Sequence, residues 1–393
     1  MRERLIRRLQ PLRRRLDPLL QRLDPLRRRL EPLLRWLEPL RLPALSVLTA
    51  MILGGVLIAL AGGNPLDAYA GMAEGAFGSP RAVSETLVWA TPYILAGLSV
   101  SLAFRGGLFN IGAEGQLALG ALSAAWAGHS LPRLLGADLP AALHLPATLL
   151  LGALAGALWG AAPGWIKARA GGHEVISTIM LNYVALNAVS FLLNGPMKDP
   201  APGNVLSRSP LIDESARLPA LVDGFRLHWG FPLALLAAAL VGWGLRRTAF
   251  GFEIRTAGQN PDAARYAGVR VSRTVIVTMA LSGALAGLAG ALEVSALHHR
   301  HELGFSQGYG FDAIAIALLG KAHPGGTVLA ALLFSAMRSG ATRMQFLTQI
   351  PIDVISVIQA LILLFVAADT LVRRIYRIRG ERERLVLTRG WGG

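Results

Sequence analysis

The chain contains no cysteine among its 393 residues. This excludes disulfide bonds, cysteine-based metal sites and catalysis by a thiol. Charged residues are also scarce, at 16% of the chain, whereas soluble domains carry about 25%. In their place the chain has 53% hydrophobic residues and a mean hydropathy of +0.47. This composition indicates a membrane protein, so the net charge of +15 does not indicate nucleic-acid binding.

Recognisable catalytic motifs are missing as well. The chain has no G-x-x-x-x-G-K-[ST] phosphate-binding loop, since the Gly-Lys-Ala at 320–322 fails the pattern, and it has neither HExxH nor GxSxG. Its eight histidines are scattered, apart from the group at 298–301, where a metal site is one option. We therefore expect a protein that is not an enzyme and has no catalytic residue, metal or cofactor of its own.

Residues 1–41 form a heptad repeat marked by proline at 11, 18, 25, 32 and 39. Leucines between the prolines make one apolar stripe, and 13 arginines against 5 acidic residues give a net charge of +8. Interior prolines cost about 3 kcal/mol each, so short kinked helices are expected. The pattern favours a basic amphipathic cytoplasmic arm that lies on anionic lipids. The alternatives are a dispensable extension, a mis-assigned start or a protein-docking arm.

Ten apolar segments follow this arm and define a transmembrane domain over 42–372. A helix needs about 20 apolar residues to cross a bilayer. The eighth and ninth segments are shorter, and we expect half-helices or a re-entrant pair near 310–340. The predicted fold is an all-α polytopic integral membrane protein. Its segments are 42–66, 86–104, 109–128, 145–166, 175–195, 228–245, 274–293, 313–320, 327–337 and 352–369.

The distribution of arginine predicts the orientation of these segments. Residues 1–41 carry +8 and the basic tail 373–393 carries +5, which leaves only +2 for the residues between them. Because basic residues stay on the cytoplasmic side, both ends are expected there. The loop 246–273 is then cytoplasmic, and the loop 195–227 is external. No signal peptide precedes the first apolar segment, so we expect the chain to be retained whole.

Polar residues inside the apolar segments are the candidate pathway residues. Asn110 and Glu114 are four apart and are expected to share a helix face, while Gln116 points elsewhere. A glutamate within a span is costly unless it faces a cavity, the bundle interior or a helix end. Glu114 therefore either lines a translocation pathway or acts as a buried clamp that fixes the break between the second and third spans.

A second polar stripe runs along the fifth segment, where Glu174, Thr178 and Asn182 recur every four residues. Such a stripe needs either a water-filled pathway or a polar neighbouring helix. Asp312, on the short eighth segment, has the same two interpretations. Glycines repeat every four residues at 152, 156 and 160, and again at 283 and 287, which is typical of close helix packing in lipid.

The loop 246–273 contains the signals of a short, well-capped helix over 260–268. Asn260 suits the N-cap, Pro261 the first helical position and Gly268 the position after the C-cap. Asp262 favours the positive helix end. A capped helix displayed in the cytoplasm is suited to dock into a partner protein, and the alternative is a surface helix with no partner. Its candidate contact residues are Asn260, Pro261, Asp262, Arg265, Tyr266 and Gly268.

Four segments together carry a resemblance to a known family. They are Gly107-LFNIGAEGQ-Leu117, Gly172-HEVISTIMLNYVA-Leu186, Gly258-QNPDAARYAGV-Arg270 and Gly310-FDAIAIALLGKAHPGG-Thr327. The chain resembles, over about 45–370, the permease subunit of bacterial nucleoside-type ABC importers, in the ribose and branched-chain amino-acid permease superfamily. The proline heptads have no counterpart in that pattern.

The resemblance implies a permease subunit in a bacterial cytoplasmic membrane. It implies an ATP-binding ABC ATPase subunit that holds ATP-Mg, a second related permease and an extracytoplasmic substrate-binding protein or lipoprotein. It also makes the helix over 260–268 the coupling helix. A nucleoside is the solute expected from the nucleoside-type motifs. The alternatives are the same machinery for a simple sugar or related solute, or a stand-alone secondary transporter or channel.

Overall fold

The computed structural model describes residues 41–306 and 308–377. The arm expected over 1–41 therefore lies outside the described residues except for Arg41, as does the tail beyond residue 377. Within the described residues the chain is helical, with only two isolated β-bridges, Arg208 to Glu302 and Ala220 to His228. The prediction of an all-α fold is confirmed for this part of the chain.

The helices follow one another through short turns, with one long irregular segment between α6 and α7. An unlabelled first helix spans Arg41–Leu60. The others are α2 Pro65–Phe77, α3 Pro80–Arg105, α4 Ala113–Leu135, α5 Ala141–Ala170, α6 Glu174–Asn194, η1 Glu214–Ala216, α7 Gly230–Arg247, α8 Ala249–Gln259, α9 Pro261–Tyr266, α10 Val271–Glu293 with the π-helical turn η2 Val294–His298, α11 Tyr309–Leu319, α12 Pro324–Thr348, α13 Asp353–Ala367 and α14 Asp369–Ile375.

Five of the described helices are long and apolar enough to cross a membrane. A sixth span is obtained if α7 and α8, which are bent by 76° relative to each other, are taken as one broken span. The five are Arg41–Leu60, α3, α5, α6 and α10 with its π-helical turn. The chain is thus a multi-pass membrane protein, while the count of ten elements stays a prediction.

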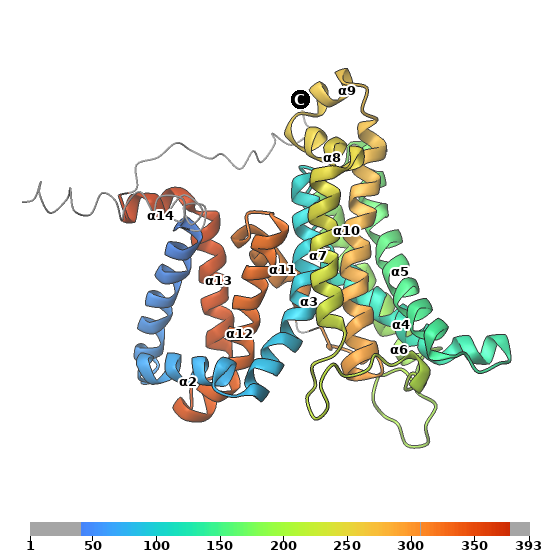
Figure 1. Ribbon diagram of the computed structural model, residues 1–393, viewed down its shortest axis with the longest axis horizontal. Coiled ribbons are helices and arrows are strands. Elements are labelled where there is room, and N and C mark those ends of the chain that lie inside the picture. Colours follow the sequence, from blue (N-terminus) through green and yellow to red (C-terminus); the bar gives the residue numbers. More distant parts are fainter. Residues whose placement is uncertain (1–40, 307, 378–393) are drawn as a thin grey trace, which may run out of the picture.

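Helix α3 lies at the centre of the molecule (Figure 1). It contacts α10 and α7 on one side and α11 and α12 on the other. Its side chains Tyr93, Ile94, Leu95 and Leu98 are completely or almost completely buried. Ser79 starts the helix by accepting a hydrogen bond from the amide of Ala82 at 3.1 Å, with proline as the first helical residue. This central helix joins the two groups of helices that Figure 1 separates.

Glycines hold α5 and α10 together, in the most extensive helix pair among the described elements. A Cβ atom on Gly156 would collide with the carbonyl oxygen of Gly283, and one on Gly287 would collide with that of Gly152. The two backbones are therefore in direct contact, as glycines repeated every four residues allow. The predicted role of these glycines in close packing is confirmed.

Several predicted boundaries are wrong, and each has a local cause. The third segment begins at Ala113 rather than 109, because a turn at 106–112 precedes it. The ninth is a helix of 25 residues, α12, and is no half-helix. Only α11, with 11 residues, is as short as predicted. Three α-helices among the described residues were not predicted, α2, α8 and α14, since charged residues interrupt their apolar pattern.

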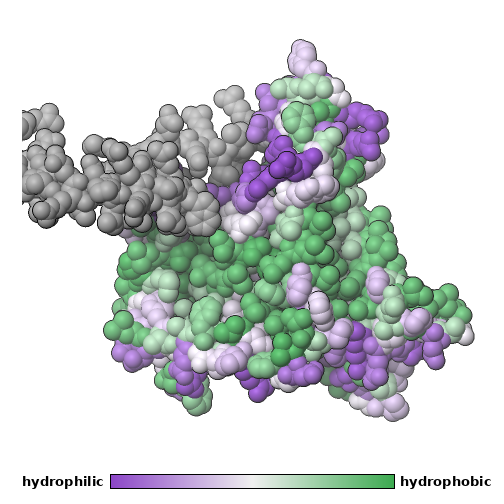
Figure 2. Space-filling model, in the orientation of Figure 1, coloured by the Kyte–Doolittle hydropathy of each residue, from purple (hydrophilic) through white to green (hydrophobic). Residues whose placement is uncertain are grey.

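Two polar ends flank an apolar belt on the face shown in Figure 2. The start of the helix Arg41–Leu60, α14, α8 and α9 lie toward one end, and the long segment 195–229 lies at the other (Figure 1). Both ends of the described chain are therefore on the same side of the belt, as the predicted orientation requires. Which side is cytoplasmic stays a prediction.

Candidate functional site

Asn110 organises the turn between α3 and α4. Its side-chain amide donates hydrogen bonds to Ser282 Oγ at 2.7 Å and Gln116 Oε1 at 2.8 Å. Its oxygen accepts bonds from the Gly112 amide and from Gln116 Nε2, both at 3.0 Å. Because Asn110 precedes α4, the prediction that it shares a helix face with Glu114 is wrong. Gln116 bonds to Asn110, whereas Glu114 bonds to Ser306 and Gly310, so the two side chains have different partners.

Glu114 is a buried clamp, but it fixes a different part of the chain from the one expected. Its two oxygens accept hydrogen bonds from Ser306 Oγ and from the amide of Gly310, the latter at 2.7 Å. Its side chain joins the first turn of α4 to the start of α11. The break between α3 and α4 is held by Asn110 instead. Glu114 is only 4% exposed, so these two donors replace water around its carboxylate.

The polar stripe on α6 faces α4. Asn182 accepts a hydrogen bond from the amide of Gly115 at 2.9 Å and donates one to the carbonyl of Ile111 at 2.8 Å. Thr178 is buried and bonds to the carbonyl of Glu174 in its own helix at 2.7 Å. This geometry corresponds to the packing interpretation of the stripe.

Glu174 closes the connection between α5 and α6 with a buried ion pair. Its carboxylate lies 2.8 Å from Lys167 Nζ at the end of α5, and the two side chains are only 7% and 4% exposed. Burying two charges costs several kcal/mol each unless they meet at short range, as they do here. The pair fixes how α6 leaves α5 and links the polar stripe to the α5–α10 pair.

Asp312 has a different setting, because it belongs to a half-buried aromatic and charged cluster. Tyr93 donates a hydrogen bond to Asp312 Oδ2 at 2.8 Å. The guanidinium of Arg338 on α12 lies over the ring of Trp89, 5.5 Å from its centre. Tyr309 packs edge-on against Tyr93, with ring centres 5.3 Å apart. We call these five residues the aromatic cluster.

The aromatic cluster is partly exposed although it contains charged side chains, which a surface that faces lipid would lack. Trp89, Asp312 and Arg338 are each partly exposed. Sequence reasoning identified only Asp312 and missed the other four members. A signal for them exists, since Trp89 and Tyr93 are four apart on one helix and Arg338 interrupts an otherwise apolar run. The sequence alone does not show that the packing of α3, α11 and α12 brings these residues together.

The short helix predicted over 260–268 is present as α9. Asn260 is its N-cap and accepts hydrogen bonds from the amides of Asp262 and Ala263, both at 3.0 Å. Pro261 is its first residue, and Gly268 follows the C-cap with φ of +82°, a left-handed conformation that suits glycine. These cap predictions are confirmed.

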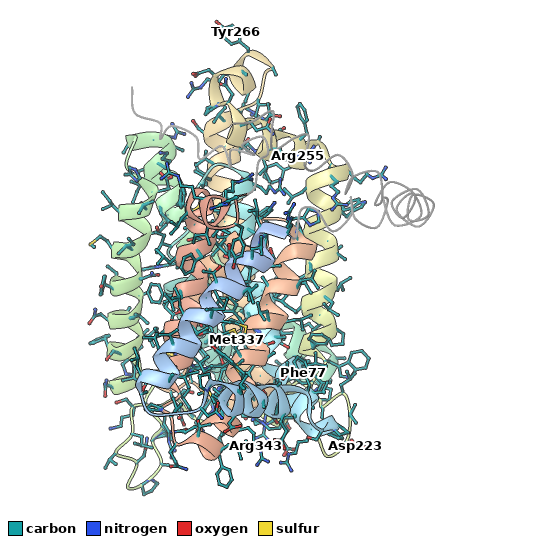
Figure 3. The ribbon with its side chains drawn as sticks, turned by 90° about the vertical axis from the view of Figure 1, so that its left-hand side faces the viewer. Phe77, Asp223, Arg255, Tyr266, Met337 and Arg343 are labelled. Carbon is teal, nitrogen blue, oxygen red and sulfur yellow. The ribbon has the colours of Figure 1, made fainter. Side chains whose placement is uncertain are left out.

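Helix α9 presents its side chains at the tip of the molecule. Tyr266 is 95% exposed and is the outermost labelled residue in Figure 3. Arg265 forms an ion pair with Asp262 at 2.5 Å on the surface of the helix. The preceding helix α8 packs against α7, α9 and α10, and supports α9 from below. An exposed aromatic ring on a supported helix is a feature of partner-binding surfaces.

The histidines near 298–301 form no metal site within the described residues, where no group of three or more histidine, aspartate or glutamate side chains is close enough to hold an ion. His298 pairs with Glu293 at 3.6 Å. His301 is 1% exposed and packs edge-on against Phe305, with ring centres 4.5 Å apart. Burial, together with a smaller effect of the nearby His298, lowers the pKa of His301 to about 3.

Three known proteins with similar sequences are all named as permeases of ABC transporters. The chain is 39% identical to the guanosine ABC transporter permease protein NupP of Bacillus subtilis, over 85% of this chain and 94% of the relative. It is 36% identical to the glucose ABC transporter permease protein TsgB13 of Haloferax volcanii, over 86% and 89%. It is 34% identical to the nucleoside ABC transporter permease protein NupB of Lactococcus lactis, over 84% and 91%.

No solved structure matches the chain. A family model, described as the permease component of the branched-chain amino acid transport system, matches residues 82–367. That range runs from the start of α3 to the end of α13 and includes α9 and the aromatic cluster. By this match and by the relatives above, the chain belongs to the branched-chain amino acid transport system permease component family.

Proposed function

We propose that the chain is the permease subunit of an ATP-driven importer and forms half of the pathway for a nucleoside. Two of the relatives above are permeases named for guanosine or nucleosides, and they cover most of the chain. In this proposal a second, related permease supplies the other half. An ABC ATPase subunit binds ATP-Mg, and an extracytoplasmic substrate-binding protein or lipoprotein delivers the solute.

The aromatic cluster is the observation that supports our choice of the residues that line the pathway. Asp312 and Arg338 lie on helices within the bundle, yet both are partly exposed. Charged side chains at such positions face a water-filled cavity or a partner subunit, because exposure to lipid costs several kcal/mol. A nucleoside offers a flat ring that stacks on Trp89 and polar edges that hydrogen-bond to Asp312. The cluster therefore matches both parts of the proposed solute.

The remaining polar candidates have a supporting role in this proposal. Hydrogen bonds within the chain use the side chains of Asn110, Gln116, Glu114 and Asn182. Such bonds leave little capacity for a passing solute. We propose that they, with Glu174 and Thr178, hold α4, α6 and α11 in place behind the pathway wall formed by Asp312.

Helix α9 is the proposed contact with the ATPase. It is polar, lies beyond the apolar belt and displays Tyr266 at its tip. Its place between α8 and α10 would transmit a movement of the ATPase into the bundle. This assignment puts α9 and both chain ends in the cytoplasm of a bacterium and the segment 195–229 outside. With α4, α7 and α11–α13 counted as membrane elements, the proposed total is ten.

Reconstitution with and without the ATPase tests the proposal. The complete importer in liposomes should take up labelled guanosine only when ATP is supplied on the ATPase side, and the permease chain alone should take up none. Uptake by the chain alone would instead favour a stand-alone carrier. Glucose is the second candidate solute, because a relative named for glucose is 36% identical. Competition of unlabelled glucose against guanosine decides between the two.

A further inference from the structure

A basic groove lies at the α9 end of the bundle, away from the aromatic cluster. It has a volume of about 650 Å³ and is formed by the last turn of α5, the end of α9 and the first two turns of α10. Four arginines line it, at positions 169, 265, 270 and 273, and none of its lining residues is acidic. An anion is therefore the ligand that its charge fits.

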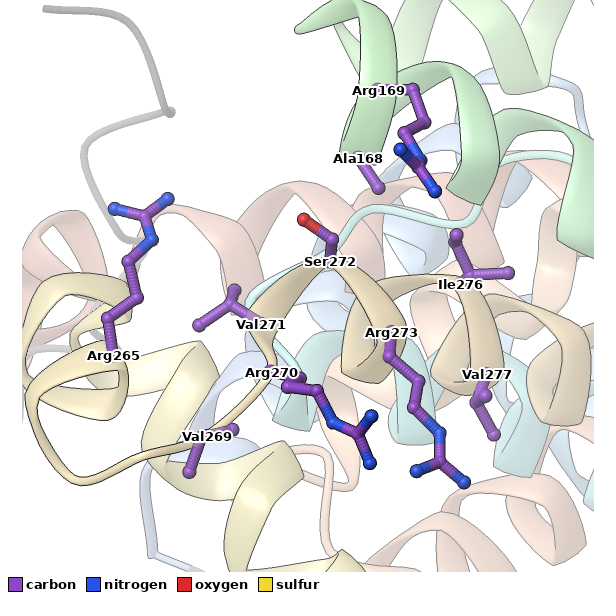
Figure 4. Close-up of a pocket in the computed structure, with 10 residues that line it drawn as sticks. All are labelled: Ala168, Arg169, Arg265, Val269, Arg270, Val271, Ser272, Arg273, Ile276 and Val277. Atoms are coloured by element: carbon purple, nitrogen blue, oxygen red, sulfur yellow. The ribbon is translucent and has the colours of Figure 1, made fainter.

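Three of these arginines have no carboxylate partner in the part of the chain that the structure describes. Arg265 pairs with Asp262, but Arg169, Arg270 and Arg273 form no ion pair there. All three are exposed. Figure 4 shows Arg270, just before α10, and Arg273 in its first turn extending side by side, with Arg169 reaching toward the groove from α5. Adjacent guanidinium groups favour a phosphate, which accepts paired hydrogen bonds.

The groove has an apolar wall next to its basic mouth. Ile276 and Val277 line it one turn further along α10 than Ser272 and Arg273. Residues four apart lie on one helix face, so Val277 is directly beyond Arg273. At about 1.5 Å per residue, these side chains lie roughly 6 Å deeper along the helix. Because α10 is one of the helices that can cross a membrane and the groove lies at its first two turns, we place the groove at the edge of the apolar belt.

We propose that this groove binds an anionic phospholipid of the adjoining leaflet. The arginines hold the headgroup phosphate, and Ile276 and Val277 contact the start of an acyl chain. A lipid satisfies both chemistries at the same depth, whereas an acidic segment of a partner protein would use only the arginines. The site uses no residue of 1–41 and no member of the aromatic cluster, so it stands whether or not the proposed solute is correct.

Native mass spectrometry of the full chain, titrated with phosphatidylglycerol or phosphatidylcholine, tests the site. Phosphatidylglycerol should bind more tightly to the wild type. Each arginine beside an anionic lipid contributes about fivefold in affinity, so Arg270→Gln with Arg273→Gln should weaken it about 25-fold. The matched control, Arg373→Gln with Arg374→Gln, removes the same charge from α14 at the same end and should leave the affinity unchanged. Arg270→Lys with Arg273→Lys should restore most of it.

Three results would overturn the lipid assignment. One is equal loss of affinity in the α14 control, which would make the effect one of general charge. Another is full competition by inorganic phosphate, which would make the site a phosphate site without an acyl contact. The last is an Arg270/Arg273 variant that keeps its lipid but loses the ATPase, which would make the groove a protein contact. If the double variant does not fold, Arg169→Gln on α5 should lower the affinity about fivefold.

Discussion

At the scale of the residue, Asp312 is the polar group whose setting differs most from the others. Glu114 and Asn182 accept or donate bonds inside the chain and are buried, whereas Asp312 receives one bond from Tyr93 and is partly exposed. A carboxylate with free acceptor capacity is able to bind a hydroxyl or an N–H group of a solute. This difference separates a side chain available to a ligand from side chains used for packing.

Substituting Asp312→Asn should lower guanosine uptake by the reconstituted importer about tenfold or more, because a hydrogen bond to a charged group contributes about 1.5–3 kcal/mol. The substitution keeps the shape of the side chain and the bond from Tyr93. Asp353→Asn, at an exposed position in the first turn of α13, is the control and should transport normally. Normal uptake by the Asp312 variant would remove this residue from the pathway.

The buried Lys167–Glu174 ion pair should be more important for stability than any exposed pair. Glu174→Gln leaves the buried ammonium of Lys167 without its carboxylate, so the free energy of unfolding should fall by about 3–5 kcal/mol. Asp213→Asn breaks the exposed pair with Arg133, whose side chains are 33% and 54% exposed, and should cost about 1 kcal/mol or less. Denaturant unfolding in detergent measures both. Equal effects would show that burial does not matter here.

At the scale of the element, helix caps could be predicted better than contacts between residues far apart in the sequence. The cap of α9 could be predicted because Asn260, Pro261 and Gly268 act within a few residues of one another. The partners of Glu114 could not, since Ser306 is 192 residues away in the sequence. The same holds for Tyr93 and Asp312, which are 219 apart. Pairing across the bundle depends on helix packing, and periodicity alone does not specify it.

The length of α12 could not be predicted from its apolar run alone. The run at 327–337 is short because Arg338 and Arg343 follow it, yet α12 continues to Thr348. The Arg338 side chain lies over an aromatic ring, and Arg343 pairs with Glu74 of α2 at 2.9 Å. A helix tolerates charges that find partners, so an apolar run underestimates its length. Helix α2, which was not predicted, supplies one of those partners.

Substitution of the exposed side chains of α9 should weaken binding of the ATPase subunit. Replacing Asp262 and Arg265 together by alanine removes the two charged groups without touching Asn260, so the helix should still form. Co-purification with the ATPase should fall by about tenfold, with normal membrane insertion. Tyr266→Ala, which removes the most exposed ring of the helix, should have a similar effect. Normal co-purification of both variants would mean that α9 is not the contact.

The segment 195–229 should open as the pH falls, because it packs on a buried neutral histidine. Ser209 and His301 exchange two hydrogen bonds of 2.9 Å, and the pKa of His301 is lowered to about 3. When the segment opens and exposes His301, the imidazole binds a proton near pH 6.5, whereas in the closed state it does not, so the stability of the closed state is complete above pH 6.5 and falls below it. At pH 5 the loss is about 2 kcal/mol.

Hydrogen exchange at the amide of Ser209 measures this opening, and exchange corrected for intrinsic rate should accelerate between pH 7 and pH 5. His301→Gln removes the titrating group and should flatten the response. His173→Gln changes an exposed histidine, 60% accessible, and should leave the response intact. A response that persists in the His301 variant would assign it to another group, such as His228, whose pKa is lowered to about 4.

At the scale of the whole molecule, charge and hydropathy together describe how the chain would sit in a bilayer. The described residues form an apolar belt between polar ends, and the positive excess of the sequence lies near its two termini. The arm at 1–41 contributes +8 of the total +15. Since it precedes the helix Arg41–Leu60 directly, it would meet the leaflet on the α9 side of the belt.

Deleting residues 2–38 should weaken binding to anionic lipid surfaces while leaving insertion of the bundle unchanged, and in the full chain anionic lipid should protect these residues from cleavage. Limited proteolysis of the full chain in vesicles with and without phosphatidylglycerol measures that protection. The anionic lipid should slow cleavage between residues 2 and 38 several-fold. If cleavage there is equally fast in both kinds of vesicle, the arm does not lie on the lipid surface, and a protein-docking or dispensable segment becomes the better interpretation.

The contact between α5 and α10 has a mechanical consequence. The apolar helix from Val271 to His298 has 28 residues and is about 42 Å long. It starts a few residues after α9, and at its far end His299 contacts the segment 195–229. Close contacts at the glycines of α5 run along it from Ile276 to Ala291, so the two helices are held together over much of its length. Two helices joined over that length should move as one body, so we expect a displacement at the α9 end of α10 to reach the segment 195–229 together with α5.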